Sequence, residues 1–184
     1  VGPRLGDVAP GVCRAGLDLS GLQGCGRTRV LVPGADGLIG KHAVSAWVGH
    51  GHVVHGVART RPQTSPPGVI WNSCDLLSNG AAGKLMAEVQ ATHLLHLAWI
   101  TEHGQFWSAE QNHDWQAASR DLVEAFGDQG GKRVVVAGSC AEYDWNRLGD
   151  GVCRENATPL KPHTLYGRCK LDFSRWLANF AHDT

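Results

Sequence analysis

Three side chains in the second half of the chain can together move a proton. Tyr166 and Lys170 stand four residues apart in the segment YGRCK, a spacing that places both on one face of a helix. A nearby ammonium stabilises a phenolate, which suits general acid–base catalysis. Ser139 follows an apolar run, and its hydroxyl can hold a substrate oxygen. A surface Tyr/Lys pair and a plain turn serine are the structural alternatives, but the ordered set predicts a catalytic site.

Three glycines near the start of the chain are spaced for a phosphate-binding turn. Gly34, Gly37 and Gly40 lie between an apolar run and an amphipathic segment. Gly34 permits a tight turn, Gly37 lets a pyrophosphate approach the backbone, and Gly40 lets a helix pack closely on the strands. The free N–H groups and positive dipole end of that helix suit a phosphate. A glycine-rich turn that binds nothing is the alternative, since the chain contains 24 glycines.

The elements that position these residues alternate between strands and helices. Apolar runs predict strands at 30–32, 53–58, 69–71, 93–97 and 133–137. Helical periodicity predicts helices at 39–48, 81–90, 108–126 and 165–182. Short connections and right-handed crossovers then predict an α/β fold, a doubly wound parallel sheet in the order 3-2-1-4-5.

The sequence also makes specific predictions for one helix start, one strand and one long loop. Ser108 and Gln111 fit a capping box at the start of the third helix. The run 133–137 is continuously apolar, as is typical of a buried parallel strand. The loop 142–163 is long, and ordered loops of this length are usually functional.

Composition excludes several classes of protein. The 17 basic and 17 acidic residues give a formal net charge of zero, which argues against nucleic acid or an anionic membrane as a partner. No apolar run approaches the ~20 residues that span a bilayer, and the amino terminus lacks the apolar core of a signal peptide. The six cysteines form no CxxC pair, so we expect reduced thiols in a cytoplasmic enzyme. His50, His52 and His55 have no Cys or carboxylate nearby, and no metal is predicted.

The chain divides into an extension and one domain. Residues 1–28 are rich in Gly and Arg without useful periodicity, so we expect them to be disordered or loosely attached. Residues 29–184 are predicted to form an NAD(P)-binding domain that is long enough for a sizeable core.

The end of the second predicted strand bears on the choice of cofactor. NAD-binding domains of this kind usually carry an acidic residue there, which bonds the ribose 2′-OH. Here the strand ends in Ala58, and Arg59 follows. No carboxylate repels a 2′-phosphate, and a guanidinium is available to pair with one. The sequence therefore favours NADP over NAD, the alternative being that Arg59 points into solvent.

Taken together, the motifs resemble the extended short-chain dehydrogenase/reductase family, also called the NAD-dependent epimerase/dehydratase family. The resemblance covers Arg29 to about Ala181 and depends on VPGADGLIG, CDLL, HLAW, AGSCAEY and ENATPLKPHTLYGRCK, in that order. It implies a Rossmann fold. The family continues beyond the YxxxK helix into the substrate lobe, which is missing here, so the chain resembles the amino-terminal portion of such an enzyme, and its activity as given is uncertain.

The resemblance also implies residues that bind the cofactor. Backbone around Leu38 and Ile39 joins the three glycines in holding the pyrophosphate. Asp75 and Leu76 match a pair that contacts adenine. The positions that line the ribose and nicotinamide are matched by Ala98 and Trp99.

The same resemblance assigns chemical roles. Tyr166 matches the acid/base, Ser139 orients the substrate oxygen, and Lys170 binds the nicotinamide ribose while tuning Tyr166. Asn112 matches an asparagine that supports the active site in many relatives, although a plain helix residue is equally consistent. Cys140 follows Ser139, where a dehydratase often carries Asp-Glu, so a reductase or epimerase is favoured.

The implied function is an NAD(P)-dependent oxidoreductase or epimerase that acts on a sugar, in the favoured case a nucleotide-linked one, by hydride transfer with Tyr acid/base catalysis. The alternative is a catalytically inactive NADP-binding sensor or scaffold. Relatives often pair through a four-helix interface, which implies a homodimer involving Trp115, Trp176 and Phe180, although core packing explains these side chains equally well.

Overall fold

A five-stranded parallel sheet forms the centre of the molecule. The structure is a computed structural model that describes residues 28–147, 151–155 and 157–183. The strands are β1 (Arg29–Pro33), β2 (Val53–Ala58), β3 (Val69–Ser73), β4 (His93–His96) and β5 (Arg133–Val136). They are arranged in the order β3-β2-β1-β4-β5, and every neighbouring pair is parallel. The predicted α/β fold and strand order are confirmed, with small differences at strand ends.

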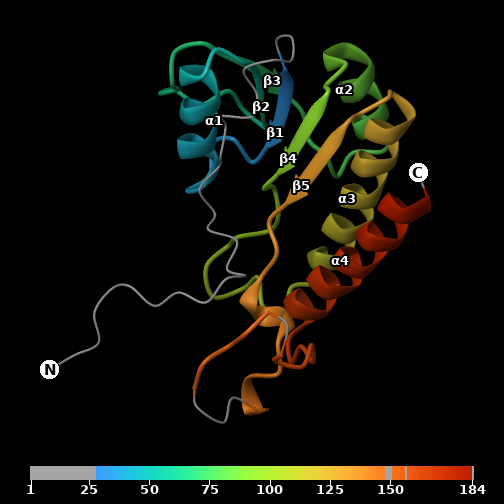
Figure 1. Cartoon of the computed structure of the whole chain (residues 1–184). Coiled ribbons are helices and arrows are strands. Elements are labelled where there is room, and N and C mark those ends of the chain that lie inside the picture. Colours follow the sequence, from blue (N-terminus) through green and yellow to red (C-terminus); the bar gives the residue numbers. More distant parts are fainter. Residues whose placement is uncertain (1–27, 148–150, 156, 184) are drawn as a thin grey trace, which may run out of the picture.

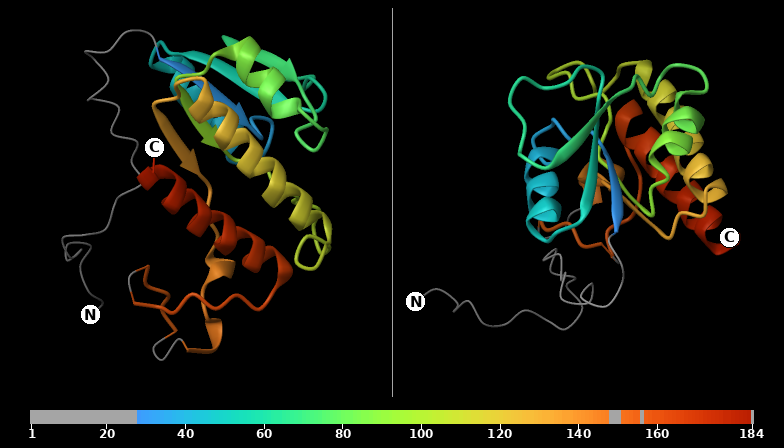
Figure 2. Two further views of the ribbon diagram at one scale, coloured as in Figure 1. Left: turned by 90° about the vertical axis from the view of Figure 1, so that its right-hand side faces the viewer. Right: turned by 90° about the horizontal axis from the view of Figure 1, so that it is seen from above.

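Helices cover both faces of this sheet. They are α1 (Gly40–Gly49), α2 (Ala81–Val89), α3 (Gln111–Asp128) and α4 (Leu165–Asp183). Figures 1 and 2 show α1 on one side of the sheet and α2, α3 and α4 on the other. Right-handed crossovers require this division, because the chain moves outward in one direction from β1 to β3 and in the other direction from β4 to β5.

Two apolar clusters hold the layers together. The larger packs the sheet against α2, α3 and α4 and includes the fully buried Leu94, Leu122 and Phe173. The smaller packs the other face against α1 through residues such as Val44 and Trp47. The alternating side chains of a strand point to opposite faces, so the continuous apolar run of β1 serves both clusters.

The start of α3 differs from the predicted capping box. The helix begins at Gln111, and its cap residue Glu110 has helical backbone angles and no side-chain capping bond. Ser108 therefore does not cap it. The side-chain nitrogen of Asn112 instead donates to the carbonyls of Phe106 and Ala109, which folds the preceding loop onto the helix.

β5 is less buried than its apolar sequence predicts. Val134 and Val136 pack on the larger cluster, but Val135 on the opposite face is 52% exposed. β5 pairs with β4 at the edge of the sheet, whereas α1 contacts β1, β2 and β3. No helix of the described residues covers this side of β5, so the expectation of a strand buried on both faces was wrong.

Thr28 lies at the predicted boundary between the extension and the domain. Thr28 is buried, and its carbonyl accepts a hydrogen bond from the Val53 amide at 3.0 Å. The rest of the predicted extension, residues 1–27, lies outside the described residues. Within the described ranges, no helix is long and apolar enough to cross a membrane.

Candidate active site

The turn between β1 and α1 needs glycine at two positions for reasons of backbone geometry. Gly34 has φ +79°, in the left-handed region that favours glycine, and a Cβ there would lie 2.8 Å from the Ala98 amide nitrogen. A Cβ at Gly40 would overlap the carbonyl oxygen of Gly34. The first turn of α1 therefore packs directly on the glycine turn, and the turn itself lies against the end of β4.

Gly37 is different, because the chain itself leaves more room there. A Cβ at Gly37 would meet a single atom within 4 Å, the Gly34 carbonyl oxygen at 3.2 Å, and its φ lies outside the left-handed region. The residue is exposed to solvent, and a Cβ there would have to displace that oxygen by only a few tenths of an ångström, so packing restricts Gly37 far less than Gly40. A ligand that approaches the backbone closely accounts for this glycine better than internal packing does.

The amides that follow Gly37 are available to an anion. The backbone N–H groups of Leu38, Ile39 and Gly40 have no hydrogen-bond acceptor in the part of the chain that the structure describes. The side chains of Leu38 and Ile39 are 79% and 63% exposed. Three unpaired amides at the start of a ten-residue helix fit a pyrophosphate group. The chain is therefore compatible with a bound dinucleotide at this turn.

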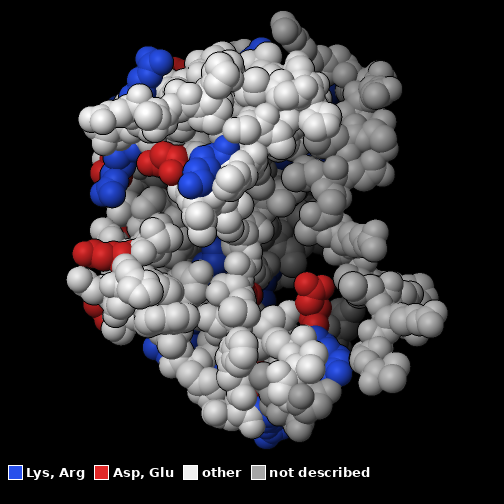
Figure 3. All heavy atoms as spheres, turned by 90° about the vertical axis from the view of Figure 1, so that its left-hand side faces the viewer, with Lys and Arg blue, Asp and Glu red and all other residues white. Residues whose placement is uncertain are grey.

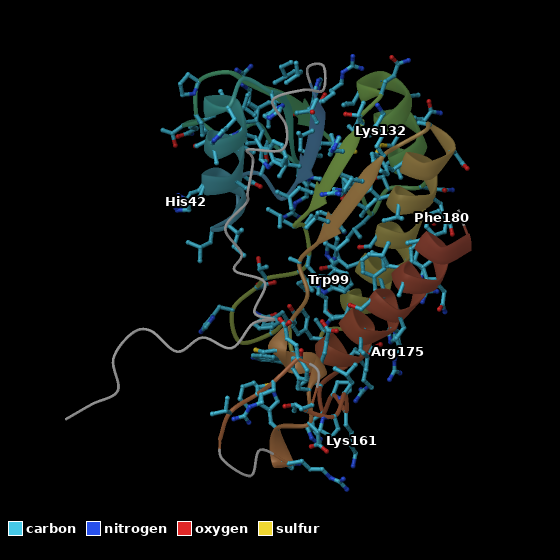
Figure 4. The ribbon with its side chains drawn as sticks, viewed as in Figure 1. His42, Trp99, Lys132, Lys161, Arg175 and Phe180 are labelled. Atoms are coloured by element: carbon cyan, nitrogen blue, oxygen red, sulfur yellow. The ribbon has the colours of Figure 1, made fainter. Side chains whose placement is uncertain are left out.

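Lys170 lies inside the site rather than on its surface. The side chain is 5% exposed, and its Nζ donates to the Ala137 carbonyl, just past the end of β5, at 2.6 Å. The ammonium also lies over the Trp99 ring, 4.3 Å from its centroid, a cation–π contact. Figure 4 shows Trp99 close to the end of β5 and to α4. Burial lowers the pKa of Lys170 to about 8, and the charge of Glu142 opposes that shift.

Tyr166, one helical turn before Lys170, is held by aromatic rings. Its ring makes edge-to-face contacts with Phe106, Trp107 and Trp99 at centroid separations of 5.0, 5.8 and 6.4 Å. Its amide donates to the Trp107 carbonyl at 3.1 Å. Its hydroxyl makes no hydrogen bond to any described residue, so the ring is fixed while the hydroxyl is free to bind a ligand.

Ser139 caps the short helix η2 (Cys140–Glu142) that follows β5. Its Oγ accepts from the Ala141 amide at 3.2 Å, and its own amide donates to Glu142 Oε1 at 2.7 Å. The hydroxyl proton of Ser139 stays free to donate to a substrate oxygen. A Cβ at Gly167 would overlap the Ala141 carbonyl, so η2 lies against the first turn of α4. The chain thus brings the Ser139 turn next to the helix that carries Tyr166 and Lys170.

Asn112 supports this arrangement through Trp99. The asparagine is fully buried, and its Oδ1 accepts from Trp99 Nε1 at 2.8 Å. Its amide nitrogen holds the loop that carries Phe106. Asn112 therefore does more than occupy a helix position, because it fixes the ring on which the Lys170 ammonium lies. Residue spacing along the chain does not reveal such a contact.

The remaining predicted cofactor residues lie at the same, carboxyl edge of the sheet. Asp75 is exposed after β3, beside a cavity of about 480 Å³ that Asn72, Ser73 and Ser78 also line. Leu76 is 8% exposed and packs in the larger core cluster, so its side chain faces the core. Arg59 is exposed immediately after the buried Ala58. These residues stay predicted cofactor contacts, as do Ala98 and Trp99.

The surface on the α1 side is hollowed between α1 and the segments that follow β5 (Figure 3). A further cavity, of about 570 Å³, has Trp107, His113 and Arg168 among its lining residues. None of the three residues Ser139, Tyr166 and Lys170 lines it. We therefore assign the proposed chemistry to the carboxyl edge of the sheet and not to this cavity.

The structure also places the candidate metal ligands, the cysteines and the aromatic side chains of the predicted dimer interface. Among the described residues, no group of three or more His, Cys, Asp or Glu is arranged to hold a metal ion. The cysteines in the same ranges are free thiols. Trp176 stacks between Phe173 and Phe180, with the Arg120 guanidinium over its ring. Packing within the chain accounts for this stack, and a homodimer through α3 and α4 stays a prediction.

His96 is a buried polar residue whose structural role the sequence did not reveal. The Ser119 hydroxyl donates to the Trp115 carbonyl at 2.6 Å, so it must accept from His96 Nε2 at 2.8 Å. His96 therefore carries its proton on Nε2, while its Nδ1 is buried without a hydrogen-bond partner in the described chain. Burial, helped by the charge of Lys170, lowers the pKa of His96 from 6.5 to about 3.

This neutral histidine makes stability depend on pH. Between pH 6.5 and about 3 the unfolded chain binds a proton at His96 that the folded chain does not. The free energy of unfolding is therefore expected to fall as pH drops through this window, by at most about 1.4 kcal/mol per pH unit. Urea unfolding at pH 7, 6 and 5 measures the slope. His96→Gln should reduce that slope. The control His42→Gln, at an exposed position on α1, should reduce it less. Equal slopes in the unchanged protein and both variants would contradict the role given to His96.

The parallel sheet, with the glycine turn at the end of β1 and helices on both faces, defines an α/β domain of the Rossmann type. Residues 30–184 match the model of the NAD dependent epimerase/dehydratase family, and the chain belongs to that family. The resemblance read from its motifs is thereby confirmed. No curated protein matches the chain in sequence.

Solved structures with the same fold include UDP-sugar epimerases and the enzyme WbmG. The UDP-glucose 4-epimerase of Thermus thermophilus, in complex with NAD, is 23% identical with a TM-score of 0.71, over 85% of this chain and 51% of that one. The UDP-Glc/GlcNAc 4-epimerase of Campylobacter jejuni is 19% identical with a TM-score of 0.73, over 85% and 50%. Bordetella bronchiseptica WbmG, in complex with NAD, is 20% identical with a TM-score of 0.69, over 85% and 51%. The chain spans about half the length of these structures.

Proposed function

We propose that this chain is the dinucleotide-binding part of an NAD(P)-dependent oxidoreductase or epimerase acting on a nucleotide-linked sugar. One observation carries the proposal. Three unpaired amides at the glycine turn share the carboxyl edge of the sheet with a free tyrosine hydroxyl and a buried ammonium. The family match and the fold shared with UDP-sugar epimerases support the choice of substrate class.

The residues of the chain take distinct parts in this chemistry. A bound nicotinamide supplies the group that accepts and returns hydride. Tyr166 exchanges the proton of the sugar hydroxyl. Its own hydroxyl is available for this step, since it has no hydrogen-bond partner among the described residues. Ser139 donates a hydrogen bond to the same oxygen. Lys170 presents its ammonium to the cofactor ribose and to Tyr166, and Trp99 and the Ala137 carbonyl hold that ammonium in position.

The choice between NAD and NADP depends on Arg59. The solved neighbours named above include complexes with NAD. In this chain β2 ends in Ala58 rather than an acidic residue, and the exposed guanidinium of Arg59 can pair with a 2′-phosphate. We therefore propose NADP as the preferred cofactor, with NAD as the alternative.

Titration of the purified chain with NADPH and with NADH, followed by tryptophan fluorescence, measures this preference. We expect NADPH to bind more tightly, and Arg59→Ser to weaken NADPH by roughly 10–100-fold, the value of one or two charge-assisted hydrogen bonds, with little effect on NADH. Arg61→Ser, an exposed arginine two residues on, is the control. Equal or tighter binding of NADH by the unchanged protein would reject the preference for NADP.

A separate assay tests the reaction itself. Interconversion of UDP-glucose and UDP-galactose, or oxidation of either sugar with added NAD(P), is expected from a form of the protein that includes a sugar-binding lobe. Dinucleotide binding without turnover of any nucleotide sugar would favour a sensor or scaffold. Absence of dinucleotide binding would reject the proposal as a whole. The cytoplasmic location expected from the composition stays a prediction.

A further inference from the structure

Glu142 is a buried acid that the proposed chemistry does not use. Its side chain is 8% exposed, and each carboxylate oxygen has a different partner. Oε1 accepts from the Ser139 amide at 2.7 Å, and Oε2 accepts from the Ser174 hydroxyl at 3.3 Å. Ser174 stands four residues after Lys170 on α4, and therefore on the same face of the helix. One carboxylate thus joins the Ser139 turn to the face of α4 that carries the ammonium.

The surroundings of Lys170 give this carboxylate an electrostatic role. The ammonium faces the Ala137 carbonyl beyond β5, the Trp99 ring after β4, and the neutral His96 of β4. Glu142 on η2 is the acidic group whose charge favours the protonated lysine, against the burial that disfavours it. A buried ammonium without an opposing charge is costly, and in that position it tends to lose its proton.

We propose that Glu142 is a positioning residue of this site: it fastens the Ser139 turn to α4 and supplies the negative charge that keeps the Lys170 ammonium protonated. The inference deepens the proposed function, since Lys170 can attract a cofactor and stabilise a phenolate only as a cation. It also explains why a buried position next to α4 carries a carboxylate rather than an apolar side chain.

A purely structural role is the competing explanation, and Asp144 provides the matched comparison. Asp144 lies two residues further along the same segment and is 2% exposed. Its Oδ1 accepts from His163 Nε2 at 3.2 Å and from the Asn146 amide at 3.1 Å, and Arg147 Nε lies 3.7 Å from its Oδ2. It therefore fastens the same segment to the loop just before α4 and faces His163 and Arg147 rather than Lys170.

The test compares Glu142→Gln with Asp144→Asn. Each change keeps the size of the side chain and removes one negative charge. Glu142→Gln is not expected to disturb the fold, because the amide oxygen can accept from Ser139 and the amide nitrogen can donate to Ser174. The chain has only five lysines, so labelling with 13C,15N-lysine and following the Cε resonances against pH resolves each one. Lys170→Arg identifies the Lys170 signal.

In the unchanged protein we expect Lys170 to titrate near pH 8. Its midpoint should fall in Glu142→Gln, because the opposing charge is gone, and should stay in place in Asp144→Asn. No fall in Glu142→Gln, or an equal fall in both variants, would overturn the proposal. If Glu142→Gln does not fold, Glu142→Asp takes its place: it draws the charge back from α4 and should lower the midpoint, and an unchanged midpoint there also overturns the proposal.

This measurement is independent of the proposed reaction, because it uses the protein without cofactor or substrate. If the Lys170 midpoint falls in Glu142→Gln but the unchanged protein binds neither NADPH nor NADH, the role of Glu142 stands and the proposed function is rejected. If the protein binds either dinucleotide but the Lys170 midpoint is unshifted in Glu142→Gln, the proposed function stands and the role of Glu142 is rejected.

Discussion

Replacing Tyr166 with phenylalanine is expected to slow turnover of a nucleotide sugar by about 10²–10⁴-fold, the usual value of a general acid–base group. The hydroxyl is the proposed proton carrier, and phenylalanine lacks it. The ring contacts with Phe106, Trp107 and Trp99 do not involve the hydroxyl, so the fold should be unaffected. Dinucleotide affinity should change little, because the loss falls on proton transfer and not on the glycine turn.

The control is the other tyrosine of the chain. Tyr143 is partly buried, four residues after Ser139, and has no part in the proposed proton transfer. Tyr143→Phe should retain most of the turnover. The rate is measured for this chain and for a form carrying the second half that the solved neighbours possess. Loss of turnover in Tyr143→Phe alone, or full activity in Tyr166→Phe, would show that another group carries the proton.

The sequence predicted the order of the strands because each element carries its own periodicity. The apolar run of β1 and the glycine turn after it are local signals, and right-handed crossovers then fix where each strand lies. Gly34 and Gly40 could also be interpreted from sequence, because their steric demands arise within the βα turn and its nearest strand.

What the sequence did not reveal depends on contacts between distant residues. Asn112 holds Trp99, and Trp99 in turn lies beneath Lys170, a chain of contacts that joins the loop after β4, α3 and α4. The exposure of Val135 depends on which strands α1 covers, and not on the composition of β5. Ser108 is an example of the converse error. Its sequence pattern matches a capping box, but in the structure Ser108 does not cap α3.

The capping-box pattern also occurs at a second position, after β5. Ser139 and Glu142 have the spacing S-x-x-E, and the structure contains both reciprocal hydrogen bonds. The motif comparison assigned a catalytic role to Ser139 and none to Glu142. The same serine can serve both purposes, because capping uses its oxygen as an acceptor and catalysis uses its proton.

Two alanine substitutions in the glycine turn are expected to have different effects: Gly40→Ala should reduce stability, and Gly37→Ala should reduce affinity for the dinucleotide. At Gly40 the added methyl group overlaps the Gly34 carbonyl, which is backbone and cannot move aside easily. Gly40→Ala should therefore lower the free energy of unfolding by about 1–3 kcal/mol or more. At Gly37 the methyl group makes one tight contact, 3.2 Å from the same carbonyl oxygen, which a shift of a few tenths of an ångström relieves, so Gly37→Ala should fold and lose much less stability than Gly40→Ala.

The second variant is the more informative, because its defect should appear only when the ligand is added. Gly37 directly precedes the unpaired amides of Leu38 and Ile39, where the pyrophosphate is proposed to lie, so an added methyl group is expected to obstruct its approach. A misfit of about 1.4–3 kcal/mol corresponds to roughly 10–100-fold weaker binding of NADPH. Thermal unfolding and fluorescence titration of both variants separate the two effects, with Gly49→Ala, a glycine in α1 with open space around it, as the control. Unimpaired binding by a stable Gly37→Ala protein would mean that the dinucleotide does not approach the backbone here, and that this glycine has no function in the site.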